Sequence, residues 1–196
     1  MDSVKRVALI ESVIQVVAKH GFHGASICLI AGGADVAAGT IYVHFESKDH
    51  LVLETYRELE RRCLSAVTKE YPSHGSIRQR FFHLAHGVIS HCTAFPADFL
   101  FLDQFLSSPY RESAIPNDLP DSGIKSILQL FREGTEKHLF KEMPSAMLFA
   151  VACGPLMQVL RANAAGIIIL NNELITQTLE ACWEAVSLGS LARDGK

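Results

Sequence analysis

The sequence lacks several features that mark common functional classes. No run of lysine or arginine is longer than two, so the chain has no polybasic tail for nucleic acid. The five cysteines form no Cys-x-x-Cys pair, which argues against a zinc ribbon or a disulfide framework and fits a reducing compartment. The formal net charge is −3. A role in DNA binding therefore has to be reconciled with a slightly acidic chain.

Long apolar runs and secretion signals are also missing. The longest uncharged window, residues 143–160, falls short of the roughly 20 residues that span a bilayer and contains Pro144 and Pro155. We interpret this window as a buried helix. Near the N-terminus, Glu11 interrupts a short apolar stretch and no cleavage site follows, so a secretory signal is not expected. These observations predict a cytoplasmic protein that does not enter the membrane.

The sequence carries no motif for catalysis or metal binding. It has no glycine-framed serine, no His-Glu-x-x-His pattern and no phosphate-binding glycine loop. His83 and His86 share a helical face, but a metal site needs three or four converging ligands. We therefore expect no enzyme activity, no metal site and no cofactor.

What the sequence does contain is a high apolar content with helical spacing. Hydrophobic residues make up 48% of the 196 residues, which excludes general disorder and supports a buried core of one or two domains. Apolar positions recur at spacings of three and four in a first helix that runs from about Val7 to Gly21. Ser26 and Ser47 are suited to cap later helices, and the helix after Ser47 ends before Pro72.

The remainder of the chain also reads as helix. Further helices are predicted near residues 37–43, 76–93, 96–107, 123–139, 145–162 and 171–189, with a proline-rich connection over 109–120. No alternating strand pattern persists. The predicted fold class is all-α, with about nine helices.

The first 48 residues have the order of a helix-turn-helix. A longer first helix precedes two short helices that a tight turn joins, and such a unit presents its second short helix to the major groove of DNA. This order is common enough among helical proteins that it does not by itself identify a DNA-binding protein.

The residues from Ala31 to Leu51 make the interpretation specific. They closely resemble the helix-turn-helix of the TetR family of bacterial transcriptional regulators. The matching positions are Ile30, Ala31, Ala34, Val36, Gly39, Thr40, Tyr42, Phe45, Ser47, Lys48, Asp49 and Leu51. The resemblance implies a DNA-binding domain over residues 1–48, with its motif at about 26–45. It also implies a helical effector-binding and dimerisation domain over 49–196.

The second short helix and its surroundings supply the candidate DNA contacts. Hydroxyl groups of Thr40 and Tyr42 suit phosphate contacts, and small or apolar side chains can touch thymine methyl groups. Lys48 lies in the first turn of its helix, where its positive charge is opposed by the helix dipole. A nearby DNA phosphate would make this position favourable, and the resemblance implies the same phosphate contact. The candidates are Ala37, Ala38, Thr40, Tyr42, Val43, His44 and Lys48. Phe45 is expected in the core instead.

Two positions depart from the family pattern. Asp35 stands where the family has a turn glycine, and aspartate tolerates positive φ better than most residues. Ala37 replaces the usual capping serine, a loss that costs about 1 kcal/mol. Across residues 1–48, Lys5, Arg6, Lys19 and Lys48 are balanced by Asp2, Glu11, Asp35 and Glu46. We call residues 1–48 the head. Because the head has no net charge, operator binding is predicted to weaken only slightly as the salt concentration rises.

The middle of the chain concentrates aromatic residues. Of 11 phenylalanines, all but Phe22 and Phe45 lie between Phe81 and Phe149. They can simply form a core, but the resemblance implies that these helices surround an effector pocket, and pockets are mostly apolar. Candidate pocket residues are Phe81, Phe82, His83, His86, Phe99, Asp103, Gln104, Phe105, Tyr110, Phe131 and Phe149.

The last two helices, about 145–162 and 171–189, are apolar over much of their circumference. Helices of this kind must be buried on several sides, which a homodimer with a four-helix interface would achieve. The sequence therefore predicts a homodimeric DNA-binding regulator. It would be a repressor that binds double-stranded operator DNA and leaves it when a small apolar effector binds. The alternative is a helical ligand-binding or scaffold protein with a degenerate head, which Asp35 and Ala37 favour. A helical enzyme is the third option.

Overall fold

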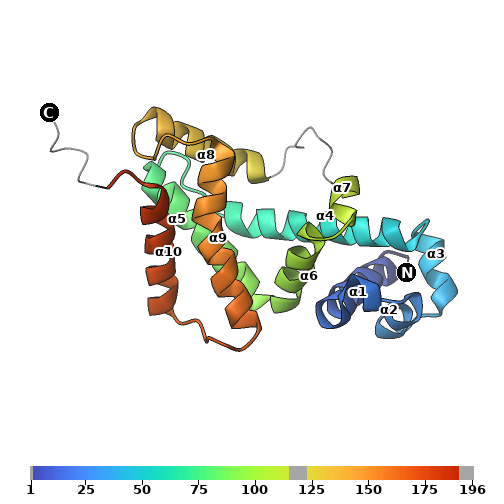
Figure 1. Cartoon of the computed structure of the whole chain (residues 1–196). Coiled ribbons are helices and arrows are strands. Elements are labelled where there is room, and N and C mark those ends of the chain that lie inside the picture. The colour runs from blue at the N-terminus through green and yellow to red at the C-terminus, as the bar shows by residue number, and fades with distance from the viewer. Residues whose placement is uncertain (1, 115–122, 190–196) are drawn as a thin grey trace, which may run out of the picture. The chain divides into compact units, whose positions relative to one another are not determined.

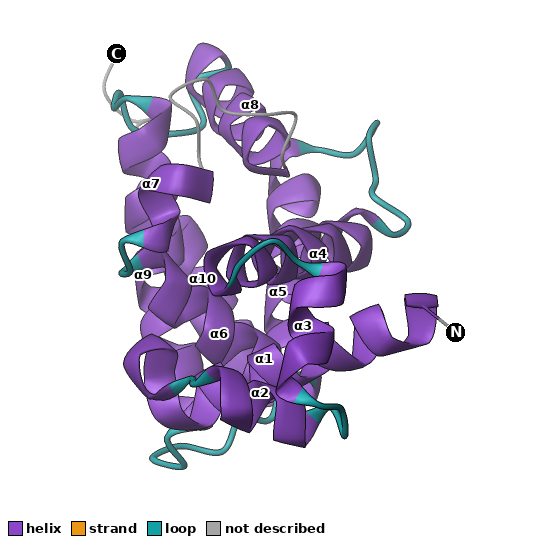
Figure 2. Cartoon of the chain, turned by 90° about the vertical axis from the view of Figure 1, so that its right-hand side faces the viewer, coloured by secondary structure: helices purple, strands orange, loops and turns teal. Residues whose placement is uncertain are grey.

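The computed structural model describes residues 2–114 and 123–189, and these residues are almost entirely helical (Figure 1). Within these ranges no strand forms, and Phe140 and Ser187 make an isolated antiparallel bridge (Figure 2). The helices are α1 (Asp2–Gly24), α2 (Ile27–Gly33), α3 (Ala38–His44), α4 (Lys48–Thr68), α5 (Ile77–Ala94), α6 (Pro96–Leu106), α7 (Tyr110–Ala114), α8 (Gly123–Glu136), α9 (Ser145–Ala164) and α10 (Asn172–Val186). The all-α prediction is confirmed.

The main difference from the predicted elements lies in the proline-rich connection. Its first part forms the short helix α7 (Tyr110–Ala114), which the sequence pattern did not indicate because a five-residue helix has no measurable periodicity. Residues 115–120 of that connection lie outside the described residues. The remaining helices match the predicted ranges to within a few residues, as expected for boundaries that fray.

The predicted helix starts and stops have visible causes. Ser26 Oγ accepts a hydrogen bond from Leu29 N at 3.2 Å, and Ser47 Oγ accepts one from His50 N at 3.0 Å. Each bond satisfies an amide that the first helical turn leaves without an intrahelical partner. Gly21, with φ 69° and ψ 171°, breaks the helical geometry of α1 at the predicted position. The chain then makes one further short turn to Gly24.

The chain divides into two compact units, which we describe separately. The first comprises Met1–Arg62 and Phe95–Pro120, and the second Cys63–Ala94 and Asp121–Lys196. This division differs from the predicted boundary between residues 48 and 49. Most of α4, together with α6 and α7, belongs with the N-terminal helices because α6 packs directly on α1.

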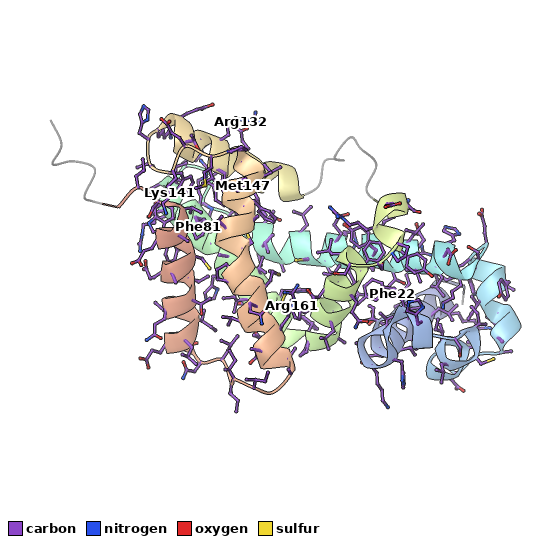
Figure 3. The ribbon with its side chains drawn as sticks, viewed as in Figure 1. Phe22, Phe81, Arg132, Lys141, Met147 and Arg161 are labelled. Carbon is purple, nitrogen blue, oxygen red and sulfur yellow. The ribbon has the colours of Figure 1, made fainter. Side chains whose placement is uncertain are left out.

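The core of the first unit gathers one face of α1 with side chains of α2, α3, α4 and α6. Its fully buried members include Leu9, Ile14, Ile30, Ile41, Leu51, Leu59, Phe101 and Phe105. Phe22 lies at the end of α1, with its ring centroid 5.3 Å from that of Phe101 (Figure 3). Tyr56 of α4 stacks on Phe105 at 4.2 Å. Aromatic contacts therefore join α6 to the N-terminal helices.

The second unit packs α5, α8, α9 and α10 around an aromatic cluster. Phe81 and Phe140 both contact Trp183, with ring-centroid distances of 5.4 and 5.2 Å. In Figure 1, α9 and α10 run side by side, in agreement with their extensive contact. Lys141 N donates to Val186 O at 2.9 Å, which ties the segment after α8 to the end of α10.

The window expected to be a buried helix is only partly buried in a single chain. It forms α9, which continues through Pro155. Its buried positions are Leu148, Ala152, Leu156 and Leu160, which are spaced four apart and mark one face. Met147, on another face, is 54% exposed (Figure 3).

Candidate nucleic-acid interface

A tight turn joins α2 and α3 and sets them at 89° to one another. Asp35 lies in this turn with φ 52°, so aspartate adopts the left-handed conformation that the sequence analysis predicted for it. Asp35 N donates to Gly32 O at 3.2 Å, and Val36 N donates to Ala31 O at 3.0 Å. The turn is therefore closed by backbone hydrogen bonds even though it lacks a glycine.

Buried residues anchor both short helices to α1. Ile41 and Phe45 of α3 are 0% and 2% exposed, which confirms the prediction that Phe45 belongs to the core. The guanidinium of Arg6 lies over the Phe45 ring, 5.3 Å from its centroid. On α2, Ile30 O accepts a hydrogen bond from Ser12 Oγ at 2.6 Å. These contacts fix which face of α3 remains available to a partner.

The available face of α3 is small and apolar. Its exposed residues are Ala38, Gly39, Tyr42 and Val43, whose spacing places them together on one side of the helix. Tyr42 is 58% exposed and Val43 is 76% exposed. Ala37 is the N-cap and makes no side-chain capping bond, as predicted.

Three other candidates border this face. Thr40 and His44 are half-buried positions of α3, and His44 lies in its last turn. Lys48 begins α4, and its Nζ donates to Phe22 O at 3.4 Å. That bond holds the amine near the end of α1.

Ion pairs account for part of the charge of this head. Arg6 pairs with Glu54 and Glu11 pairs with Arg62, so one basic and one acidic residue of α1 each bind α4. Arg62 also pairs with Glu58 at 2.8 Å. Burial by itself lowers the pKa of Arg62, but the hydrogen bonds and charges of Glu11 and Glu58 outweigh it and raise the pKa above its usual value. The network fastens α1 to α4 and leaves the head without a basic surplus.

The candidate pocket residues fall into two separate groups. Phe99, Asp103, Gln104, Phe105 and Tyr110 belong to α6 and α7 in the first unit. Phe105 is fully buried, and Gln104 Nε2 donates to Val17 O at 3.2 Å, beside the break at Gly21. Tyr110 OH donates to Asp49 at 3.0 Å, and burial together with this bond raises the pKa of Tyr110 to about 12. The contacts of Gln104, Phe105 and Tyr110 hold α6 and α7 to the N-terminal helices and α4.

The second group lies in the second unit. Phe81 contacts Phe82, Phe131 and Trp183, and Phe131 contacts Phe149 at 6.5 Å. Of the two histidines, His83 lies against Tyr71, and His86 is exposed beside Ser90. Among the described residues, no group of three or more metal-ligating side chains converges. The structure thus brings together the four phenylalanines of α5, α8 and α9, whereas those of α6 belong to the first unit.

Sequence reasoning missed two residues that matter to the geometry of the head. Gly39 belongs to the exposed face of α3, and its spacing from Val43, one turn later, was the signal that could have found it. Ser12 anchors α2, but a serine on an otherwise apolar helical face gives no indication of which carbonyl it will bind.

Two short helices at nearly a right angle, anchored from behind with the second exposed, define a helix-turn-helix DNA-binding unit. Comparisons with known proteins agree. Residues 9–55 match the family described as bacterial regulatory proteins, tetR family, and residues 56–188 match the tetracyclin repressor-like C-terminal domain. The chain belongs to the TetR family and is a DNA-binding transcriptional regulator.

Individual relatives match over little more than a third of this chain and of their own length. The fatty acid metabolism regulator protein of Bacillus subtilis is 33% identical over 76 residues, which is 39% of this chain and 39% of that protein. The HTH-type transcriptional regulator BetI of Vibrio atlanticus is 36% identical over 70 residues, which is 36% of this chain and 35% of that protein.

Solved structures match the fold over nearly the whole chain. A TetR family transcription regulator from Marinobacter aquaeolei has a TM-score of 0.81 at 22% identity, covering 95% of this chain and 97% of that one. The transcriptional regulator FadR from B. subtilis, solved in complex with stearoyl-CoA, has a TM-score of 0.76 at 15% identity, covering 91% and 98%.

By length and composition alone, α9 could cross a membrane, with a mean hydropathy of 1.4 over its most apolar window, and α2 with α3 pass the same test as a bent pair. Both segments lie within the regions that match the TetR family domains. This family context, together with the buried face of α9, accounts for its apolar character.

Proposed function

We propose that the protein is a homodimeric cytoplasmic repressor that leaves its operator when a small apolar effector binds. The observation that carries the proposal is the α2–α3 unit, which is anchored by Ile41 and Phe45 and exposes one face of α3. A closed turn at Asp35 favours a head that still reads DNA over a degenerate one. Contacts to operator DNA are assigned to Ala37, Ala38, Thr40, Tyr42, Val43, His44 and Lys48.

Dimerisation is supported by the surfaces of α9 and α10. Only 22% of the apolar window of α9 is buried within one chain, and its exposed positions include Ala146, Ala150 and Gly154, four residues apart. On α10, Leu174 and Ala181 are also exposed. Small residues in a row let two helices approach closely, and a two-fold axis would bring the second copy's α9 and α10 against them. Such a dimer presents two heads to a palindromic operator.

The effector assignment rests on the aromatic cluster of the second unit. Phe81, Phe131 and Phe149 offer apolar surface from three helices, and pockets for apolar ligands use such surfaces. Binding would shift the population toward a conformation in which the two heads no longer match the operator spacing. Because one fold neighbour was solved with stearoyl-CoA, a long-chain acyl-CoA is the first probe to use.

The test is selection of duplexes from a random DNA pool with the full-length protein, followed by binding measurements with and without stearoyl-CoA. We expect an enriched palindrome that binds more weakly when the acyl-CoA is present. Enrichment of no sequence at low salt by an intact dimer would support the ligand-carrier alternative. An enriched sequence whose affinity is unchanged by stearoyl-CoA, and by other apolar compounds that bind the protein, would contradict effector release.

The dimer is tested separately with Ala150→Glu, which places a charge on the exposed face of α9. Burying an unpaired charge costs several kcal/mol, so the variant should sediment as a monomer and lose operator affinity. Ser90→Glu, at an exposed position of α5, is the control and should sediment like the parent. A dimeric Ala150→Glu variant would place the interface elsewhere.

A further inference from the structure

The exposed face of α3 lacks the side chains that distinguish bases by paired hydrogen bonds. Residues 37–44 read Ala-Ala-Gly-Thr-Ile-Tyr-Val-His and contain no arginine, lysine, asparagine, glutamine, aspartate or glutamate. Those six types make the specific contacts to guanine, adenine and cytosine edges in the major groove. Hydrogen-bond readout by α3 is thereby restricted to single contacts. Most of the surface that α3 offers is that of methyl and methylene groups, which complements the 5-methyl group of thymine.

Gly39 is a second, independent observation. A glycine inside a helix costs about 0.5–1 kcal/mol relative to alanine. Apart from the chain neighbours of Gly39 and the backbone of its own helix, no described residue lies within 4 Å of the position that a Cβ would occupy there, so packing does not require this glycine. Its neighbours on the exposed face, Ala38 and Val43, are also short. Glycine is suited to sites where the backbone closely approaches a ligand, and the ligand on this face is DNA.

We propose that α3 approaches the floor of the major groove closely at Gly39 and recognises pyrimidine 5-methyl groups through Ala38 and Val43. The inference rests on the proposed function and names the chemistry of its operator. Each half-site contains thymines whose methyl groups contact α3. At those positions 5-methylcytosine satisfies the same contact, because it carries the same methyl group in the same groove.

The first test replaces thymine by deoxyuridine, one position at a time, in the duplex selected from the random pool. Removal of a buried methyl group should weaken binding about fourfold per contact, and about 16-fold for the symmetry-related pair in a palindrome. A cytosine at a sensitive position should bind weakly, and 5-methylcytosine there should recover most of the affinity. Deoxyuridine duplexes that bind as tightly as thymine duplexes would overturn the proposal.

The second test uses Gly39→Ala, with Gly32→Ala as its matched control. Gly32 is also exposed and helical, with nothing within 4 Å of its Cβ position, but it belongs to α2. Both variants should raise the melting temperature, because each replaces a helical glycine without a clash. Only Gly39→Ala should bind the selected duplex more weakly, by about tenfold per head and about 100-fold for the two heads together, since about tenfold is the loss typical of one misfit at a base-pair contact. Parental affinity in Gly39→Ala would contradict close approach.

The third test assigns the methyl contact to a side chain. Val43→Ser should reduce the discrimination between thymine and deoxyuridine duplexes, whereas Val4→Ser, at a comparably exposed valine of α1 (72% against 76%), should retain it. Retention of full discrimination by Val43→Ser would remove Val43 from the proposal. The two levels of failure are distinct: enrichment of no sequence overturns the proposed function, and enrichment without methyl sensitivity overturns only this inference.

Discussion

At the scale of single residues, one contact decides how α2 sits on α1. Ser12 Oγ donates to Ile30 O, and a Cβ added at Gly33 would lie 2.4 Å from the same oxygen. Gly33 is therefore required by a neighbouring hydroxyl group, since its own backbone has no positive φ. The left-handed conformation of Asp35 and the burial of Phe45 were predictable from the sequence, because each follows from a local rule. The pairing of Ser12 with Ile30 was not, because it depends on how two helices meet.

This contact predicts a coupled pair of substitutions. Gly33→Ala should destabilise the protein by about 1–3 kcal/mol through overpacking. Ser12→Ala should cost about 0.5–1.5 kcal/mol, because it removes one of the two hydrogen bonds that Ile30 O accepts and leaves the one from Ala34 N at 3.2 Å. In the double variant the clash is gone, so its loss should be smaller than the sum of the two. Urea denaturation of the four proteins measures the coupling, and strict additivity would show that Gly33 and Ser12 do not interact.

Two tyrosines of the first unit should make the stability of the protein fall at alkaline pH. Burial, followed by the nearby Glu60, raises the pKa of Tyr56 to about 12, and burial with the Asp49 bond does the same for Tyr110. The folded state therefore favours the neutral phenols, while the unfolded chain ionises them near 10.0. Their contribution is complete below about pH 10 and is lost as the pH rises through about 12.

Urea midpoints recorded across this alkaline range should fall with pH, and Tyr56→Phe should fall less steeply than the parent. Tyr71→Phe is a suitable comparison, because Tyr71 lies in the second unit and should leave the alkaline dependence of the first unit intact. An identical slope in the parent and Tyr56→Phe would exclude Tyr56 as a source.

At the scale of elements, helical periodicity predicted where the helices lie better than it predicted their partners. The spacing of apolar residues in α5, α6, α8 and α9 identified each as a helix with a buried face. It could not show that Phe105 of α6 joins the core of the first unit while Phe81 contacts Phe131 and Trp183, because periodicity carries no information about the opposite side of the contact. The candidate pocket residues consequently include members of both units.

The contact of α8 with the segment that follows it gives an element-scale prediction. A Cβ at Gly134 would lie 2.1 Å from Cδ2 of Phe140, a fully buried ring 5.2 Å from Trp183. Gly134→Ala should therefore cost about 1–3 kcal/mol. The single tryptophan reports the change, as a lower urea midpoint by fluorescence. Adding Phe140→Leu should recover part of the loss, and an unchanged midpoint in Gly134→Ala would show that the ring moves aside freely.

At the scale of the whole molecule, the charge balance limits how the protein holds DNA. The net charge is −3, the first 48 residues are balanced, and Arg6 is engaged with Glu54. Electrostatic attraction is therefore expected to contribute little, and in the proposed dimer the affinity would come from two heads that engage one operator together.

The salt dependence of operator binding should accordingly be shallow. With about two to four phosphate contacts per dimer, the slope of log affinity against log salt should not exceed about 4 in magnitude. Lys48→Ala should reduce this slope by about 1 per head, and Lys5→Ala should change it less. A parental slope near 8 would indicate many more ion pairs than this chain is expected to supply.

The small side chains on α3 also bear on how this regulator could change over time. Ala38 and Val43 are exposed and support no packing inside the head, so replacements there cost the fold little. A single change such as Ala38→Gln would introduce an adenine-reading amide onto a surface that now has none. Operator preference in this protein is therefore free to drift by point substitution while its stability stays the same, which makes the head a ready starting point for redirected DNA recognition.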